Sequence, residues 1–146
     1  MNWTEYFLNL AEQIKLKSKD QSTKIGAVIV GIDNEVLSTG YNSFPRGLND
    51  NVPERQERPQ KYFWMVHAEI NAIINAARIG TPVKNSTIYL TCGLPCADCS
   101  KAIINAGIKK IVCKNERNDV KGDLWIEHRK VSIEMLNECN IEIEYY

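Results

Sequence analysis

Hydrophobic side chains recur along this chain with two periods, one typical of helices and one typical of strands. A spacing of three or four positions from Trp3 to about Lys17 predicts an amphipathic helix. Similar patterns predict three more helices, at about 66–79, 96–106 and 124–139. A glycine directly follows the second and the third of these helices, as is common at helix C-termini.

Short runs of β-branched residues lie between the helices. They predict five strands, at 25–32, 36–41, 86–91, 108–113 and 141–145. The first two are separated by Asp-Asn-Glu, which predicts a hairpin. Strands that alternate with helices indicate an α/β fold, here a three-layer α/β/α sandwich around one mixed, five-stranded sheet.

Two polar stretches interrupt this pattern. The longer one runs from Asn42 to about Lys61 and contains three of the five prolines. Loops of more than about 12–15 residues in compact domains tend to be functional or disordered, so this stretch is expected to form a lid or a binding wall. A mobile surface loop without a role is the alternative. The second polar stretch covers residues 115–122.

Length and charge narrow the class of protein. The 146 residues suffice for one domain, expected to span residues 1–146, and for a core that needs no disulfides. Lysine plus arginine and aspartate plus glutamate both number 18, so the formal net charge is zero. Proteins whose affinity rests on a phosphate backbone usually carry a basic excess, so this balance argues against a nucleic-acid partner. The balance does not argue against small anionic ligands, because one or two local cations suffice to bind them.

Neither a membrane span nor a secretory signal is expected. The apolar runs are far shorter than the ~20 residues that a bilayer requires, and the N-terminus lacks a basic start followed by an apolar stretch. The five cysteines are an odd number, and two of them form a Cys-x-x-Cys pair. Without an export signal, that spacing favours metal or redox chemistry over disulfides and predicts a cytoplasmic protein.

Two short motifs carry the chemistry, His-Ala-Glu at 67–69 and Pro-Cys-Ala-Asp-Cys at 95–99, and both fall where a helix begins. Cys96 and Cys99 are three positions apart, so in a first helical turn both sulfurs face the same way. A helix N-terminus also favours thiolate over thiol. With the imidazole of His67, the two sulfurs form a three-ligand set that suits Zn²⁺ and leaves a fourth position for water, as in catalytic zinc sites.

Glu69 is predicted to carry protons rather than to bind the metal. It lies two residues from His67, so the two side chains do not share a lateral face of the helix. A carboxylate at this point can take a proton from water and pass it to a ring nitrogen and a leaving amine. His-x-Glu followed by Pro-Cys-x-x-Cys is the signature of zinc-dependent nucleobase deaminases.

Other interpretations of these residues stay open. A redox Cys-x-x-Cys pair leaves the His-x-Glu motif without a role, and a structural zinc needs a fourth ligand from Cys92 or His128. Otherwise Cys92, Cys113 and Cys139 are expected to be small buried hydrophobic residues. His128 lies among charged residues of the last helix and is expected to be exposed to solvent.

With these residues in place, the chain resembles the cytidine deaminase superfamily and, within it, the deoxycytidylate (dCMP) deaminases. The resemblance covers about 24–113 and rests on the segments at 23–30, 38–42, 44–47, 66–73 and 95–108. Gly-Tyr-Asn at 40–42 with Phe-Pro-Arg-Gly at 44–47 narrows it to the branch that uses nucleotides. The fold it implies is cytidine deaminase-like.

The resemblance implies hydrolysis of dCMP to dUMP and ammonia, a reaction that supplies dTMP synthesis. Glu69 would protonate N3 of the ring and then the departing amine. By position, Asn42 resembles the residue that binds the sugar hydroxyl, and the backbone N–H of Ala68 the group that meets the pyrimidine carbonyl. The family also implies a homo-oligomer, a hexamer or a dimer, activated by dCTP and inhibited by dTTP, with a Mg²⁺-nucleotide as effector.

The 5′-phosphate of such a substrate needs cations or hydrogen-bond donors at the mouth of the pocket. The local candidates are Ser22, Lys24, Arg46, Arg55 and Arg58. Ser22 and Lys24 are favoured because they match the family's first-strand segment. For each arginine the alternative is a solvated loop charge.

Three features depart from the family's pattern. Ser43 stands where glycine is usual, and the segment 91–95 carries one residue more than the commoner spacing before the first metal cysteine. Larger members also carry an insertion with cysteines and histidines for a second zinc. This chain has only Leu-Asn-Asp-Asn at 48–51, which predicts one zinc per subunit.

Competing functions come from three classes: a deaminase of another nucleotide or of a nucleoside, a tRNA adenosine deaminase, and a catalytically silent module that binds nucleotides. The neutral charge and Asp98, where the tRNA enzymes tend to have methionine, argue against the second class. Glu69 argues against the third, because a pure binder needs no proton carrier.

Overall fold

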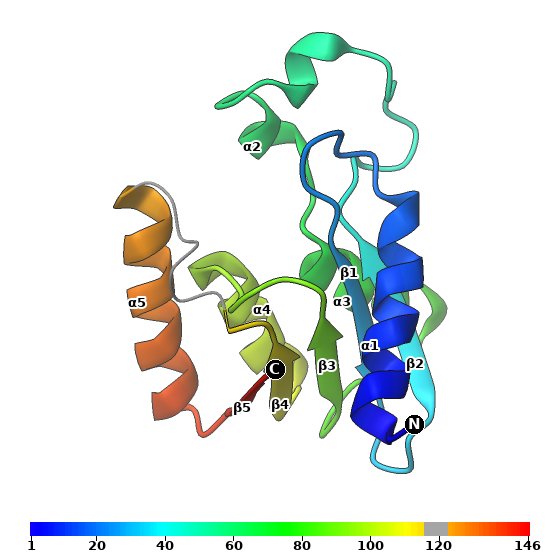
Figure 1. The fold of residues 1–146 in the computed structure, drawn as a ribbon, viewed down its shortest axis with the longest axis vertical. Helices are drawn as coiled ribbons and strands as arrows, with labels where there is room; N and C mark the ends of the chain where they lie inside the picture. Colours follow the sequence, from blue (N-terminus) through cyan, green and yellow to red (C-terminus); the bar gives the residue numbers. More distant parts are fainter. Residues whose placement is uncertain (116–122) are drawn as a thin grey trace.

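One mixed sheet of five strands lies at the centre of the computed structural model, which describes residues 1–115 and 123–146 (Figure 1). In spatial order the strands are β2 (Val36–Tyr41), β1 (Gly26–Val30), β3 (Thr87–Leu90), β4 (Lys110–Cys113) and β5 (Glu142–Tyr145). β1 runs antiparallel to both of its neighbours, whereas β3, β4 and β5 are parallel. The predicted mixed, five-stranded α/β architecture is therefore confirmed.

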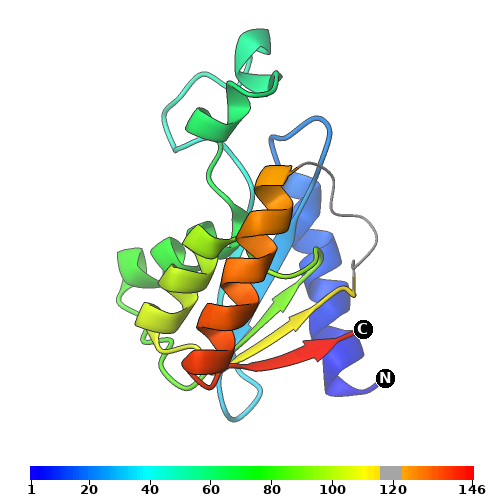
Figure 2. The ribbon, with the colours of Figure 1, turned by 90° about the vertical axis from the view of Figure 1, so that its left-hand side faces the viewer.

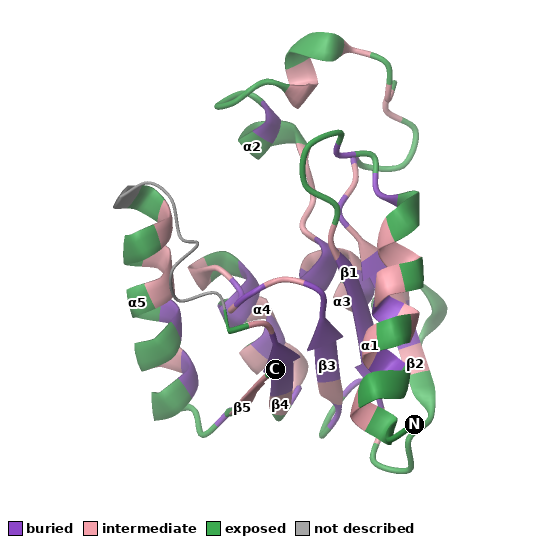
Figure 3. Cartoon of the chain, viewed as in Figure 1, coloured by how far each residue is buried: buried purple, intermediate pink, exposed green. Residues whose placement is uncertain are grey.

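Helices cover both faces of this sheet (Figure 2). α1 (Trp3–Ile14) packs on one face, while α3 (Ala68–Ile79), α4 (Ala97–Ala106) and α5 (Asp123–Glu138) cover the other. Successive strand residues point to opposite faces, so the sheet contributes to two cores, and its three central strands β1, β3 and β4 are mostly purple in Figure 3. Burying one large apolar side chain contributes roughly 1.5–3 kcal/mol, so these two interfaces supply the main stabilisation of the fold.

β1 illustrates this division. Ala27 and Ile29 join the core beneath the three helices, whereas Val28 and Val30 pack with Phe7 of α1. All five residues of β1 are buried, as expected for a central strand covered on both faces.

Two glycines let the helices approach the sheet closely. A Cβ on Gly40 of β2 would lie 2.3 Å from the backbone nitrogen of Ala72 in α3, and one on Gly26 would lie 2.1 Å from the carbonyl oxygen of Ala11 in α1. No side chain fits at these distances. The close approach at Gly40 sets the position of α3, and with it the position of the His-Ala-Glu motif.

The long polar stretch leaves the body of the protein as an arm, defined here as residues 44–65 (Figure 1). An antiparallel bridge between Ser43 and Val66 closes its base. The arm contains a 3₁₀ turn, η2 (Pro53–Gln56), and a single helical turn, α2 (Lys61–Trp64). Its helical content was not predicted, because both helical pieces are too short to show a period.

Element boundaries differ from the predicted ones by a few residues. A 3₁₀ turn, η1 (Lys15–Lys17), follows α1 and takes up the last predicted positions of the first helix. His67 and Cys96 are the N-caps of α3 and α4, just before the first helical residues. The predicted polar stretch at 115–122 lies, apart from Asn115, outside the described residues. None of the helices in the described part of the chain is long and apolar enough to cross a membrane.

Candidate active site

The N-termini of α3 and α4 bring the three predicted metal ligands together. Nδ1 of His67 lies 3.3 Å from Sγ of Cys99 and 3.6 Å from Sγ of Cys96. The backbone N–H of Cys99 donates to Sγ of Cys96 at 3.5 Å and so caps α4. The three donor atoms lie within 4.8 Å of one another.

The arrangement of these donors fits a tetrahedral zinc ion. Bonds of about 2.3 Å to sulfur and about 2.0 Å to nitrogen would place the ligand atoms roughly 3.5–3.8 Å apart. The observed separations of 3.3 and 3.6 Å need only small adjustments to reach that geometry. One imidazole and two thiols form a donor set that zinc prefers, and three protein ligands leave one position open.

The same three groups already share protons. A hydrogen bond from the Cys99 thiol, supported by His67, lowers the pKa of Cys96 and so favours its thiolate. The contact with Cys96 raises the pKa of His67 to about 9. The shared hydrogen bond and burial raise the pKa of Cys99. A divalent cation would displace these protons, as metal binding to thiols and imidazole generally does.

Glu69 lies beside this cluster and is almost fully enclosed. Its side chain comes from the first turn of α3, and the residue is 4% exposed. Burial raises the pKa of its carboxyl group, an effect that the nearby His67 ring opposes. The Cys92 thiol lies 3.9 Å from Oε1 of Glu69, within the range of a weak S–H hydrogen bond. An enclosed carboxyl group beside a metal site suits proton transfer.

The cluster opens into a cavity of about 960 Å³ that several parts of the chain surround. His67, Glu69 and Cys96 lie on its wall. Asp20, Thr23 and Asn42 contribute from the body of the protein, and the arm contributes Arg58, Lys61, Tyr62 and Met65. The last helix contributes Trp125, His128 and Arg129. The arm and α5 thus both line this space, and the arm forms part of the wall, as predicted.

The structure separates the five phosphate candidates. Arg58 lines the cavity, whereas the other four are not among its lining residues. Ser22 donates to Asp20 and accepts from Lys61, and Lys24 is exposed. Arg46 donates to Oδ1 of Asn75 at 2.7 Å.

Arg55 is held by two neighbours within the arm. Its guanidinium group lies 4.2 Å above the ring of Trp64. It also donates to the carbonyl oxygen of Asn49 at 3.2 Å. The aromatic face and the backbone oxygen therefore account for its orientation away from the cavity.

The contribution of α5 to the cavity was not predicted from the sequence. The Trp125 ring lies 5.7 Å from Tyr62 of the arm, 6.5 Å from His67 and 5.4 Å from His128. These rings join the arm, the metal site and α5. No local sequence pattern predicts this cluster, because about 60 residues separate Tyr62 and His67 from the two rings of α5.

The expectation that His128 is a solvated surface residue was wrong. Its Nδ1 accepts a hydrogen bond from the backbone N–H of Ala97 at 3.1 Å, and the side chain is half-buried on the cavity wall. Ala97 is the first residue of α4, so its N–H has no partner within the helix. His128 therefore satisfies a helix N-terminus right beside Cys96.

The three remaining cysteines differ from one another. Cys113 is buried in the core as expected. Cys92 is half-buried and lies on the cavity wall, and Cys139 is exposed, so the expectation of a buried residue was wrong at these two positions. Cys139 is exposed because it follows the last turn of α5, where the chain turns back towards β5.

A comparison with protein families agrees with this geometry. The model of the cytidine and deoxycytidylate deaminase zinc-binding region matches residues 1–115. The chain belongs to this deaminase family. The resemblance drawn from the two motifs is therefore confirmed, and so is the expectation of a zinc-binding deaminase.

Individual relatives and one solved structure support this membership. Human deoxycytidylate deaminase is 37% identical over 122 residues, which cover 80% of this chain and 67% of the relative. The deoxycytidylate deaminase of phage T4 is 31% identical over 181 residues, covering 92% and 93%. The crystal structure of dCMP deaminase from cyanophage S-TIM5 with dCMP and dUMP is similar with a TM-score of 0.76 and 27% identity, covering 97% of this deaminase and 95% of that chain.

Proposed function

We propose that this deaminase hydrolyses dCMP to dUMP and ammonia. One observation carries the proposal: the His67, Cys96 and Cys99 donors converge beside the enclosed Glu69, on the wall of a cavity large enough for a nucleotide. The relatives named deoxycytidylate deaminases share this family. Zinc, when bound, acts as the Lewis acid that turns water into a nucleophile at neutral pH.

Glu69 moves the protons of the reaction. Its carboxylate takes a proton from the attacking water and delivers it to N3, while the oxygen of the water bonds to C4. It then transfers the second proton of that water, from the oxygen now bonded to C4, to the exocyclic amine. The C4–N bond breaks, and ammonia leaves. The carboxylate ends the cycle as it began, so Glu69 acts as a shuttle.

Two groups orient the substrate at its base and its sugar. Ala68 is the first residue of α3, so its N–H has no partner inside the helix and can bind the pyrimidine carbonyl. Asn42 lies on the cavity wall and donates one of its two amide hydrogens to the carbonyl oxygen of Thr23. The amide retains a second hydrogen for the sugar hydroxyl.

Arg58 of the arm and Arg129 of α5 bind the 5′-phosphate. Both line the cavity, and guanidinium groups bind phosphate oxygens in pairs through charge-assisted hydrogen bonds. Lys61 also lines the cavity, but its ammonium group lies against the carboxylate of Asp20. A phosphate beside Lys61 would therefore meet a negative charge.

The finer features of the proposed enzyme follow the family resemblance. Within residues 1–115 and 123–146, His67, Cys96 and Cys99 form the one group of three such ligands, which supports one zinc per subunit. A cytoplasmic homo-oligomer in pyrimidine metabolism, activated by dCTP with Mg²⁺ and inhibited by dTTP, completes the proposal. Light scattering with and without each nucleotide, run beside activity assays, tests the assembly and its regulation.

Ammonia release from dCMP, deoxycytidine, CMP and tRNA, measured in parallel with the zinc-loaded protein, tests the function. We expect dCMP to be the preferred substrate. Preference for deoxycytidine would move the protein to the nucleosides, and turnover of tRNA alone would make it an RNA enzyme. Binding of dCMP without turnover of any of the four substrates would indicate the silent module.

A further inference from the structure

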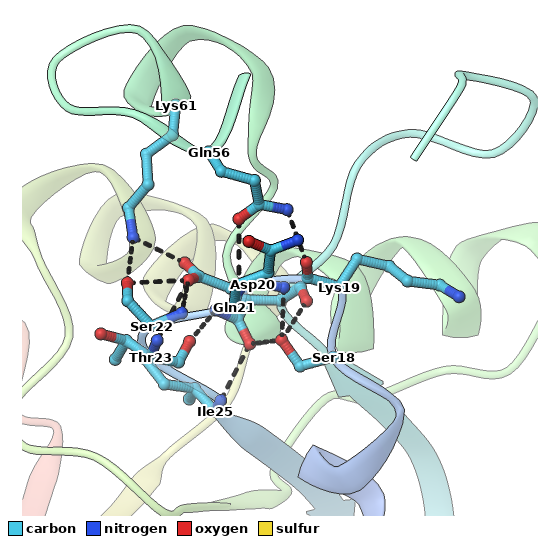
Figure 4. A network of polar contacts seen from close by, with 10 residues as sticks. Ser18, Lys19, Asp20, Gln21, Ser22, Thr23, Ile25, Gln56 and Lys61 are labelled. Atoms are coloured by element: carbon cyan, nitrogen blue, oxygen red, sulfur yellow. Dashed lines mark hydrogen bonds and ion pairs between the residues drawn. The ribbon is translucent and has the colours of Figure 1, made fainter. Parts of the chain in front are cut away.

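A buried ion pair between Asp20 and Lys61 also lies on the wall of the cavity. Nζ of Lys61, in the arm, lies 2.8 Å from Oδ2 of Asp20 and 2.9 Å from Oγ of Ser22. Lys61 is 4% exposed and Asp20 is 3% exposed. Figure 4 shows the lysine side chain reaching from the arm to the segment 18–25. Neither charge takes part in the proposed proton transfers.

Asp20 also accepts hydrogen bonds from the backbone of its own segment. While Oδ2 accepts from Lys61, Oδ1 accepts from the backbone N–H groups of Ser22 and Thr23, at 2.9 and 3.0 Å. These bonds fold residues 20–23 into a tight turn (Figure 4). The position of the Thr23 backbone therefore depends on Asp20, and the position of Asp20 depends on Lys61.

Thr23 in turn holds the amide of Asn42. The Thr23 carbonyl oxygen accepts from Nδ2 of Asn42 at 2.7 Å. Oδ1 of Asn42 accepts from the backbone N–H of Ile25 at 2.8 Å and lies 2.6 Å from Oγ of Ser18. With three neighbours fixing its plane, the amide presents its remaining N–H in one direction.

A buried ion pair is a poor device for stability alone, because the cost of removing two charges from water offsets their attraction. An apolar pair of similar volume would hold the arm as well. What an apolar pair would lack is the carboxylate that accepts from the turn at 20–23. The geometry therefore favours a directional role for this pair.

We propose that Asp20 and Lys61 are positioning residues for Asn42, and that through Asn42 they set the recognition of the sugar hydroxyl. The proposal rests on the proposed function. The bonds run from Lys61 through Asp20 and the turn at 20–23 to Asn42, on the wall of the cavity that would hold the sugar. Removing the pair releases the turn at 20–23 and shifts the Thr23 carbonyl oxygen that accepts from Nδ2 of Asn42. The amide N–H that would face the sugar then changes direction, and a small misplacement of a binding group weakens recognition markedly.

Calorimetric binding of dUMP and of 2′,3′-dideoxy-UMP to the zinc-loaded protein tests this directly. The second nucleotide lacks only the sugar hydroxyl. We expect the wild type to favour dUMP by about five- to tenfold, the usual worth of one hydrogen bond. In Lys61→Met this preference should fall below about twofold, with unchanged zinc content and unchanged affinity for the dideoxy nucleotide. The KM for dCMP should rise while kcat stays within about twofold.

The exposed ion pair between Lys19 and Asp50 provides the matched control. It joins the same two segments, with a distance of 3.5 Å and side chains 50% and 39% exposed. Lys19→Met should keep the full preference for dUMP. If it loses the preference as Lys61→Met does, general loosening of the arm explains the effect and the inference is overturned.

Asp20→Asn keeps the shape of the side chain and decides the matter if Lys61→Met does not fold. Preference for dUMP that survives in both variants, or that is missing from the wild type, rejects the positioning role. Unfolding of both variants also rejects it, because the pair is then a structural requirement. None of these results touches the proposed function, which fails only if the wild type does not deaminate dCMP.

Discussion

The two ends of the cavity are built in different ways. At the metal end, the ligands lie at the N-termini of two regular helices that pack on the sheet. At the sugar end, Asn42 is held by a turn and by an arm that leaves the body of the protein. Helix N-termini fix the positions of the metal ligands and Glu69 and stabilise negative charge on the thiolates. At the sugar end, a network of hydrogen bonds fixes the orientation of Asn42.

This difference separates chemistry from recognition. Helix N-termini stabilise thiolates wherever they occur, so one arrangement can serve many deaminases. A network of directional hydrogen bonds is particular to its members, and changing one of them changes the fit. Variants at the metal end should therefore abolish turnover, and variants at the sugar and phosphate end should change which ligand is preferred.

Loss of a metal ligand should have the largest effect. Cys99→Ser replaces a thiol 3.3 Å from His67 with a weaker zinc ligand, so zinc content, thermal stability and turnover should fall together. Elemental analysis, thermal unfolding and an ammonia assay measure the three. Cys139→Ser, at an exposed position, should leave all three unchanged. Full zinc occupancy in both Cys99→Ser and Cys96→Ser would contradict the assignment.

Glu69→Gln should lower turnover without lowering zinc content. The amide keeps the shape of the side chain but cannot accept and release a proton during the reaction. We therefore expect kcat to fall by about 10²–10⁴-fold, the usual worth of a general acid–base. Zinc content and dUMP affinity should stay close to those of the wild type. Loss of zinc in this variant would make Glu69 a ligand instead.

The phosphate site is expected to shape substrate preference. With two charge-assisted bonds, from Arg58 and Arg129, the kcat/KM of the wild type for dCMP should exceed that for deoxycytidine by on the order of 10³. Arg58→Ala should lower kcat/KM for dCMP by about 10- to 150-fold and barely affect deoxycytidine.

Two variants of neighbouring cations serve as comparisons for Arg58→Ala. Arg55→Ala should have little effect, because Arg55 lies over Trp64 and not on the cavity wall. If Lys24→Ala removes the preference and Arg58→Ala does not, the phosphate binds at Lys24, as the family pattern suggests.

The smallest effect concerns acid stability. Burial alone would raise the pKa of Asp20, but Lys61 and the N–H groups of Thr23 and Ser22 hold it below its usual value. A carboxyl whose pKa is lowered by folding stabilises the protein above its unfolded pKa of about 3.9, and this contribution is lost as the pH falls through the folded value. Asp20→Asn should therefore be less stable than the wild type at pH 7, and the difference should shrink below about pH 4. Urea unfolding at several pH values measures it, and a difference that is independent of pH would contradict the linkage.

The sequence by itself determined the metal end. The spacing within each motif, His67 to Glu69 and Cys96 to Cys99, is local, because a helix N-terminus and one helical turn fix where those side chains point. That the two motifs meet was predicted from their combination, which is the signature of zinc-dependent deaminases. The order of strands and helices could also be predicted, since the spacing of hydrophobic residues is a property of each short segment. The boundaries of these elements moved by a few residues, and the two short helical pieces of the arm were not predicted.

Tertiary structure alone decided the rest of the cavity. Lys61 meets Asp20 across 41 residues, and Trp125 meets Tyr62 across an even longer separation. His128 lies among charged neighbours in the sequence, and only the packing of α5 against α4 turns it towards Ala97. Contacts of this kind depend on where whole elements pack, and a periodic pattern identifies the buried face of an element but not the neighbour that covers it.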